Sequence, residues 1–149
     1  MKLTKYLKPD QICLELNAQS KQEALETMLK IFIEKGLVPG EMYEDVLAAL
    51  IERESLTSTG IGDGVALPHV KTKAVDAIHI VIARSTKGLE FEALDGNPVN
   101  FFFMILAPVK VSDTYLKTLS SISALMKDEN IRRRLLAAKT SEEILSILG

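Results

Sequence analysis

The segment from Arg53 to His69 gathers residue types that can carry out phosphoryl transfer. A histidine ring nitrogen can be a free nucleophile near neutral pH, and Pro68 restricts the backbone that presents His69. The guanidinium of Arg53 is always charged and can donate two parallel hydrogen bonds to phosphate oxygens. We therefore predict that His69 is the nucleophile and that Arg53 neutralises the transferred group.

Small and hydroxyl-bearing residues fill the loop between these two positions. Hydroxyl groups can donate hydrogen bonds to phosphate, and glycines permit backbone conformations in which successive N–H groups point into one anion-binding concavity. The predicted phosphate-binding residues are Ser58, Thr59, Gly60, Gly62 and Gly64.

Other catalytic chemistries find less support in this segment. Its glycine spacing matches neither the dinucleotide fingerprint nor the P-loop, because no Gly-Lys-Ser/Thr follows. A hydrolase built from Ser58, Asp63 and His69 would lack the G-x-S-x-G pattern around its nucleophile. The chain has two histidines and a single cysteine, Cys13, which disfavours a metal site. We therefore expect neither a cofactor nor a metal.

The second histidine, His79, lies within an apolar and β-branched run at residues 78–82. We interpret it as a satisfied histidine inside a sheet. Burial there would make it a poor phosphoryl acceptor, since transfer requires contact with a partner's active residue.

Length and composition indicate one globular domain over residues 1–149. Hydrophobic residues make up 47% and charged residues 26% of the chain. The net charge of −2 predicts no general attraction to nucleic acid, and the basic run at 132–134 is interpreted as solvated surface because acidic residues lie nearby. One cysteine cannot form an internal disulfide, and no apolar run has the length of a signal peptide or a membrane span. We expect a cytoplasmic protein without membrane insertion.

Apolar periodicity predicts a mixture of strands and helices. The first helix is expected to start at a capping box of Ser20 and Glu23 and to stop at Gly36, and the second to begin near Gly40 and end close to Arg53. Strands are expected at 12–16, 65–67, 77–83 and 99–107, with a loop at 54–64, a turn at 95–98 and helices from 108 to the end.

Each predicted helix carries one apolar face. In the first helix this face is Ala24, Leu25, Met28, Leu29 and Phe32, and in the second it is Met42, Val46, Ala49 and Leu50. In the third helix it is Leu116, Leu119, Ile122, Leu125 and Met126, with restarts after it at Asp128 and Thr140. The expected fold is an α/β, single-domain sandwich with a mixed β-sheet flanked by helices on both faces.

The motif RESLTSTGIGDGVALPH, residues 53–69, resembles the phosphorylation-site signature of the type-2 enzyme IIA domains. These domains belong to fructose and mannitol transport and to the nitrogen-regulatory branch of the bacterial sugar phosphotransferase system. The resemblance covers nearly the whole chain, including the turn at 95–98 before an apolar strand and the closing helical segment. It implies a single α/β domain.

The resemblance also implies an activity. In this family His69 would accept a phosphoryl group from the phosphohistidine of the small carrier HPr, and Arg53 would help to bind it. In transport members the group then passes to a cysteine on a IIB partner. No nucleotide or metal is implied for the transfer itself.

One position departs from the family pattern. Many members carry a second active-site histidine at the start of the helix that follows the apolar strand, and here Tyr115 occupies that place. A tyrosine hydroxyl can donate a hydrogen bond to phosphate or imidazole but carries no positive charge near pH 7. We expect Tyr115 to lie within reach of His69 as an accessory residue.

Three functions remain open from the sequence. The first is a sugar-transport phosphoryl carrier that passes phosphate to a IIB cysteine. The second is a regulatory module of the nitrogen type, whose phosphorylation state controls its binding to other proteins, and Tyr115 favours it slightly. The third is a degenerate homologue without phosphotransfer, which the presence of Arg53 and His69 disfavours.

Overall fold

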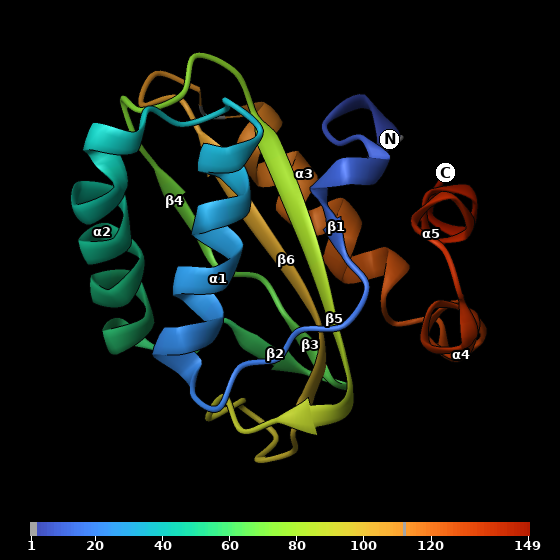
Figure 1. Ribbon diagram of the computed structural model, residues 1–149. Coiled ribbons are helices and arrows are strands. Elements are labelled where there is room, and N and C mark those ends of the chain that lie inside the picture. The colour runs from blue at the N-terminus through green and yellow to red at the C-terminus, as the bar shows by residue number, and fades with distance from the viewer. Residues whose placement is uncertain (1–2, 112) are drawn as a thin grey trace.

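The computed structural model describes residues 3–111 and 113–149. A mixed sheet of six strands runs through this part of the chain, with helices on both of its faces (Figure 1). The strands are β1 (Ile12–Cys13), β2 (Gly60–Gly62), β3 (Val65–Ala66), β4 (His69–Lys71), β5 (His79–Leu89) and β6 (Val99–Ala107). Their order is β1-β5-β6-β3-β2, and β4 also pairs with β6, so β3 and β4 lie in line along one side of β6. The predicted mixed sheet between two helical layers is confirmed.

Two helices cover one face of the sheet. Helix α1 (Lys21–Glu34) begins as predicted at Ser20, whose hydroxyl accepts a 3.2 Å hydrogen bond from the Glu23 amide. Its buried face is the predicted apolar stripe. Helix α2 (Tyr43–Leu56) follows a 3-10 turn at Gly40–Met42. It buries Leu47, whereas Met42 and Ala49 are only half-buried, so that part of the predicted stripe is wrong.

Three helices cover the opposite face: α3 (Asp113–Leu125), α4 (Glu129–Ala137) and α5 (Ser141–Leu148). The predicted restarts are confirmed, because the side chains of Asp128 and Thr140 cap α4 and α5. The predicted face of α3 is wrong at Leu116, which is 61% exposed. Tyr115 points inward instead, and because neighbouring helical residues differ by about 100°, Leu116 turns towards solvent.

The apolar core divides into two layers, one on each face of the sheet. Alternate residues of β6 enter different layers because side chains along a strand point to opposite faces. Phe102, Met104 and Leu106 join the layer beneath α1 and α2. Phe101, Phe103 and Ile105 join the layer beneath α3 to α5. Strand β6 is therefore buried on both sides, as its continuous apolar sequence predicts.

Several predicted boundaries move in the structure. Helix α2 continues to Leu56, and the expected loop at 54–64 becomes a hairpin of β2 and β3. Strand β5 runs to Leu89, six residues beyond its predicted end at 83. The first strand covers only Ile12–Cys13. Within the described residues, no helix is both long and apolar enough to cross a membrane.

Candidate active site around His69

His69 lies at the first residue of β4, next to the ends of two helices. Strand β4 pairs in parallel with β6, and His69 stands opposite Ile105, whose side chain belongs to the layer beneath α3. The rings of His69 and Tyr115 meet edge to face with centroids 5.8 Å apart. The predicted proximity of these two residues is confirmed.

A backbone hydrogen bond selects the tautomer of His69. The Nδ1 atom lies 2.6 Å from the carbonyl oxygen of Leu67. A carbonyl can only accept, so Nδ1 carries the proton and donates it. The other ring nitrogen, Nε2, is left with its lone pair. The backbone of the motif thus leaves one ring nitrogen with a lone pair that could act as a nucleophile.

The electrostatic environment keeps this imidazole neutral near pH 7. Burial lowers the pKa of His69 from its ordinary 6.5. The hydrogen bond to Leu67 opposes this effect, the charge of Arg53 adds to it, and the charge of Glu54 opposes it. The net shift is downward, so the nucleophilic, unprotonated form predominates at neutral pH.

Arg53 reaches the site from the last turn of α2. It is half-buried, and its Nη1 atom donates a 2.8 Å hydrogen bond to the carbonyl oxygen of Thr57, the residue that ends the helix. Its charge lowers the pKa of both His69 and Tyr115. The predicted cation therefore lies near the predicted nucleophile, although 16 positions separate them in the sequence.

Tyr115 contributes a neutral hydroxyl. Burial raises the pKa of its phenol to about 12, against a smaller opposing effect of Arg53. The phenol therefore stays protonated over the physiological range and can act as a hydrogen-bond donor. It cannot supply the positive charge that a histidine could supply at this position.

Lys71 is a site residue that the sequence interpretation missed. It stands two positions after His69 on β4, so both side chains point to the same face of the strand. Its ammonium nitrogen lies 5.5 Å from the centroid of the Tyr115 ring. The period-two spacing of His69 and Lys71 was the signal that could have found this second cation.

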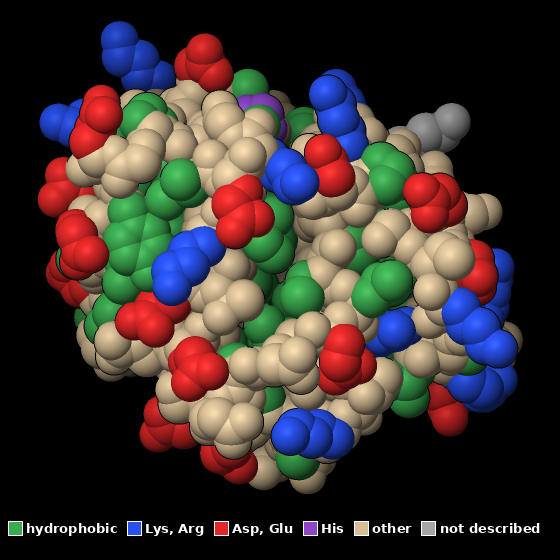
Figure 2. Space-filling model, viewed as in Figure 1, with side chains coloured by type: hydrophobic (Ala, Val, Ile, Leu, Met, Phe, Trp, Pro, Cys, Tyr) green, Lys and Arg blue, Asp and Glu red, His purple; other side chains and the backbone are tan. Residues whose placement is uncertain are grey.

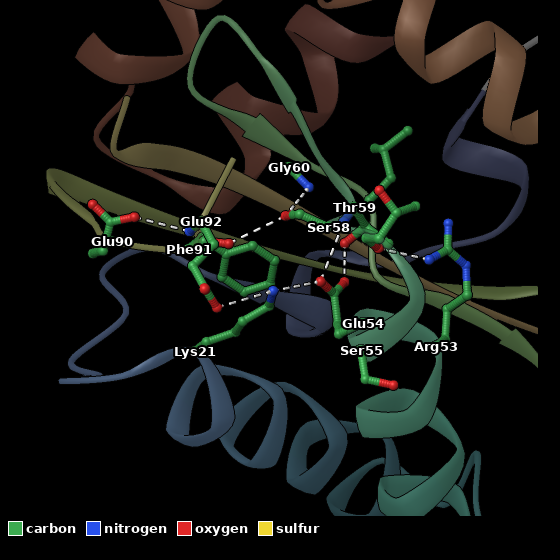
Figure 3. A network of polar contacts seen from close by, with 12 residues as sticks. Lys21, Arg53, Glu54, Ser55, Ser58, Thr59, Gly60, Glu90, Phe91 and Glu92 are labelled. Carbon is green, nitrogen blue, oxygen red and sulfur yellow. Dashed lines mark hydrogen bonds and ion pairs between the residues drawn. The ribbon is translucent and has the colours of Figure 1, made fainter. Parts of the chain in front are cut away.

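The hydroxyl groups predicted to bind phosphate are used inside the protein. Ser58 donates a 3.2 Å hydrogen bond to the Phe91 carbonyl and accepts a 3.0 Å bond from the Gly60 amide (Figure 3). Thr59 is 3% exposed, and its hydroxyl and amide both donate to the carboxylate of Glu54. Glu54, interpreted from sequence as part of a loop, is thus a buried residue of the motif.

The predicted glycine nest needs correction at Gly62 and Gly64. Both have positive φ, 107° and 76°, and turn the β2–β3 hairpin. Val65 pairs with Phe101 while His69 pairs with Ile105, and a rise of about 3.3 Å per residue places these rungs about 13 Å apart. These glycines shape the hairpin rather than a cradle beside His69.

The other sequence candidates lie apart from His69. His79 is half-buried at the start of β5, opposite Leu106, so it faces the α1 side of the sheet. Asp63 lies in the hairpin turn, so the hydrolase arrangement with Ser58 and His69 is not assembled. Among the described residues, no group of three or more His, Cys, Asp and Glu side chains is placed to hold a metal ion.

Comparison with known families agrees with this geometry. The family described as "Phosphoenolpyruvate-dependent sugar phosphotransferase system, EIIA 2" matches residues 5–149. The chain belongs to this enzyme IIA family.

Relatives of this enzyme IIA chain include components of sugar-specific phosphotransferase systems and nitrogen regulatory proteins. It is 36% identical, over its full length, to the fructose-specific EIIABC component of Bacillus subtilis, of which it covers only 23%. It is 35% identical over 93% of its length to the fructose-specific EIIA component of Haloferax volcanii, of which it covers 88%. It is 33% identical over its full length to the nitrogen regulatory protein of Bradyrhizobium diazoefficiens, of which it covers 95%.

Solved structures agree with the fold. The nitrogen regulatory protein IIA-Ntr of Neisseria meningitidis superposes with a TM-score of 0.88 at 30% identity, over 97% of each chain. The mannitol IIA of Escherichia coli superposes with a TM-score of 0.80 at 24% identity, over 96% of this chain and 99% of that one, which speaks for the fold alone.

Proposed function

We propose that this enzyme IIA domain is a phosphoryl carrier that accepts a phosphoryl group on Nε2 of His69 from phospho-HPr and passes it to a IIB cysteine. The observation that carries the proposal is the hydrogen bond from Nδ1 of His69 to Leu67, which leaves Nε2 unprotonated beside Arg53. Membership of the family supports the same activity.

The geometry suits a transfer in which no proton has to move. The Nε2 lone pair forms the new N–P bond while the bond between phosphorus and the donor imidazole breaks, and that electron pair returns to the donor ring. A donor ring protonated on its other nitrogen leaves as neutral imidazole. The His69 ring keeps its Nδ1 proton and becomes cationic, which strengthens its hydrogen bond to the Leu67 carbonyl.

Cations and a hydroxyl beside His69 suit the phosphoryl group. Arg53 would donate hydrogen bonds to its oxygens as charge develops in the transition state. Tyr115, edge to face with the imidazole, would donate one neutral hydrogen bond. Lys71 would add a second positive charge near the same ring. The onward step reverses this arrangement: a IIB thiolate forms an S–P bond, and the N–P electron pair returns to Nε2.

A regulatory role is the second candidate. Two observations favour it: Tyr115 stands where many family members have a second histidine, and nitrogen regulatory proteins are among the relatives that match over most of both chains. In this role, phosphorylation would add about −1.5 to −2 charges at the edge of the sheet and change which proteins bind there. Both candidates place the protein in the cytoplasm with HPr, without nucleic acid or membrane insertion. Acidic and basic side chains are mixed over the face of the molecule in Figure 2, an arrangement that gives little general attraction for nucleic acid.

Incubation with enzyme I, HPr and phosphoenolpyruvate, followed by intact mass measurement, tests the carrier function. We expect the mass of one phosphoryl group to be added, and none without HPr. Addition of IIB domains then separates the two roles: loss of the label to a IIB cysteine supports transport, and a label retained with every IIB tested supports regulation. A wild-type chain that takes up no label contradicts both.

A further inference from the structure

Glu54 is a buried carboxylate in the last turn of α2, directly after Arg53. Its side chain is 5% exposed. Oε2 accepts a 3.2 Å hydrogen bond from the amide of Thr59 and lies 3.0 Å from the ammonium of Lys21, and Oε1 accepts from the hydroxyl of Thr59. A buried carboxylate with this many partners holds the bonded groups of Thr59 and Lys21 in one geometry.

The bonds of Glu54 bring together segments that are far apart in the sequence. Lys21 is the first residue of α1, and its ammonium also lies 4.8 Å from the ring centroid of Phe91, in the connection between β5 and β6 (Figure 3). The same ammonium lies 3.8 Å from Glu92. The carboxylate thus ties α1, α2 and the β5–β6 connection to the loop that carries Thr59.

A short chain of bonds leads from this anchor to the nucleophile. The carbonyl oxygen of Thr59 accepts a 3.0 Å bond from the amide of Leu67, and the carbonyl oxygen of Leu67 accepts from Nδ1 of His69 at 2.6 Å. On the other side, Arg53 donates to the carbonyl of Thr57, two residues before Thr59. The loop at 57–59 therefore holds both Arg53 and, through Leu67, the ring of His69.

We propose that Glu54 is a positioning residue for phosphoryl transfer: it anchors the 57–59 loop through Thr59 and Lys21, and its negative charge supports the His69 ring as that ring becomes cationic. This inference rests on the proposed carrier function. Arg53 and Glu54 then have separate roles at two consecutive helical positions, whose side chains point about 100° apart around the helix axis. Arg53 would contact the phosphoryl group, and Glu54 would hold the loop that is bonded, through Leu67, to the imidazole.

The charge of Glu54 gives this role a measurable signature. Within the described part of the chain, the charged and titratable side chains around His69 are Arg53 and Glu54 from α2, Tyr115 from α3 and Lys71 from its own strand. Arg53 lowers and Glu54 raises the pKa of His69. Loss of the Glu54 charge should therefore lower this pKa further and make Nε2 a weaker nucleophile.

The test compares Glu54→Gln with Glu52→Gln. Glu52 is exposed on the same helix, on the other side of Arg53 in the sequence, and its substitution removes the same charge. NMR titration gives the pKa of His69 in the unphosphorylated protein, and single-turnover labelling from phospho-HPr gives the transfer rate from pH 5.5 to 8.5. We expect Glu54→Gln to lower the pKa of His69 and to slow transfer about tenfold even where the ring is fully neutral. Glu52→Gln should stay within about twofold of wild type.

Equal pKa values, rates and pH profiles in these two variants would overturn the proposal. If wild type takes up no label, the carrier function fails, and the NMR comparison still decides whether Glu54 controls His69. Circular dichroism checks the fold of each variant. If Glu54→Gln does not fold, Thr59→Val removes one anchoring hydroxyl with little change of shape and should slow transfer, with Thr59→Ser restoring most of the rate. Equal rates in the two Thr59 variants would then overturn the proposal.

Discussion

Substitution of Arg53 tests two roles of its guanidinium, which are to bond the Thr57 carbonyl and to bind the phosphoryl group. Arg53 can hold the Thr57 carbonyl with one nitrogen, at 2.8 Å, and present its other donors to a phosphoryl group. Lysine keeps the charge but has no planar fork, so Arg53→Lys loses one or the other contact. Loss of one preorganised donor to a transition state slows a reaction about 10²-fold, or about 2.7 kcal/mol. We expect this size of effect for transfer in both directions.

Arg53→Gln removes the charge as well, and this loss also changes the pKa of His69. Because Arg53 lowers the pKa of His69, its loss should raise that pKa and make Nε2 more basic. A more basic nucleophile would by itself react faster. We nevertheless expect slower transfer than in Arg53→Lys, because stabilisation of the phosphoryl charge outweighs the change in basicity.

Rapid-quench single-turnover labelling from phospho-HPr measures the rates, and NMR titration measures the pKa of His69. Arg134→Lys, at an exposed position of α4, is the matched control and should behave as wild type. The reasoning is refuted if Arg53→Lys folds normally and transfers at the wild-type rate in both directions. A pKa of His69 that falls in Arg53→Gln would refute the electrostatic part alone.

Three further predictions concern Tyr115, the pH dependence of labelling and Arg84. Tyr115→Phe should slow transfer only several-fold, since a neutral hydrogen bond contributes about 1 kcal/mol. Tyr115→His should instead speed phosphoryl exchange with HPr. A Tyr115→Phe variant without any transfer would contradict the accessory role. In a single-turnover series, the midpoint of the decline in labelling rate as the pH falls should lie below 6.5, because burial lowers the pKa of His69 from 6.5; a midpoint at or above pH 6.5 would contradict this. The Arg84 side chain, 8% exposed, donates hydrogen bonds to the carbonyls of Leu14, Leu135 and Ala138 at 3.0, 2.9 and 2.6 Å. Arg84→Met should therefore lower the free energy of unfolding by about 3 kcal/mol in urea titration. A loss under about 1 kcal/mol would show that these bonds contribute little to stability.

The elements that were predicted correctly are those whose burial follows from the sequence pattern of the element itself. Strand β6 was predicted residue for residue, because eight of its nine residues are apolar, with Asn100 as the exception, and a run of this kind is typical of a strand covered on both faces. Helix α1 was predicted from its cap at Ser20 and its stripe. The proximity of His69, Arg53 and Tyr115 was also predicted, the first two from the motif at 53–69 and Tyr115 from its place in the family pattern.

The errors come from contacts between distant segments. Glu54 was placed in a loop, and only its contact with Lys21, which lies 33 positions earlier, identifies it as a buried residue of α2. The Gly62 and Gly64 pair fits an anion nest as well as a hairpin. The pairing of β2 with β3 makes the hairpin, and the pairing of β3 with β6 places it away from His69. In α3, Leu116 was placed inside on hydrophobicity, yet Tyr115 faces the sheet because His69 and Lys71 lie there. Such pairings depend on topology, which local periodicity does not specify.

Heteronuclear NMR of the phosphorylated protein tests the central claim most directly, because long-range correlations of the imidazole nitrogens show which ring atom carries phosphorus. Labelling with phospho-HPr should place the phosphoryl group on Nε2 of His69 and leave a proton on Nδ1, which is held by Leu67. The label should be absent in His69→Ala and present in His79→Ala. A phosphoryl group on Nδ1 of His69, or on His79, would contradict the account.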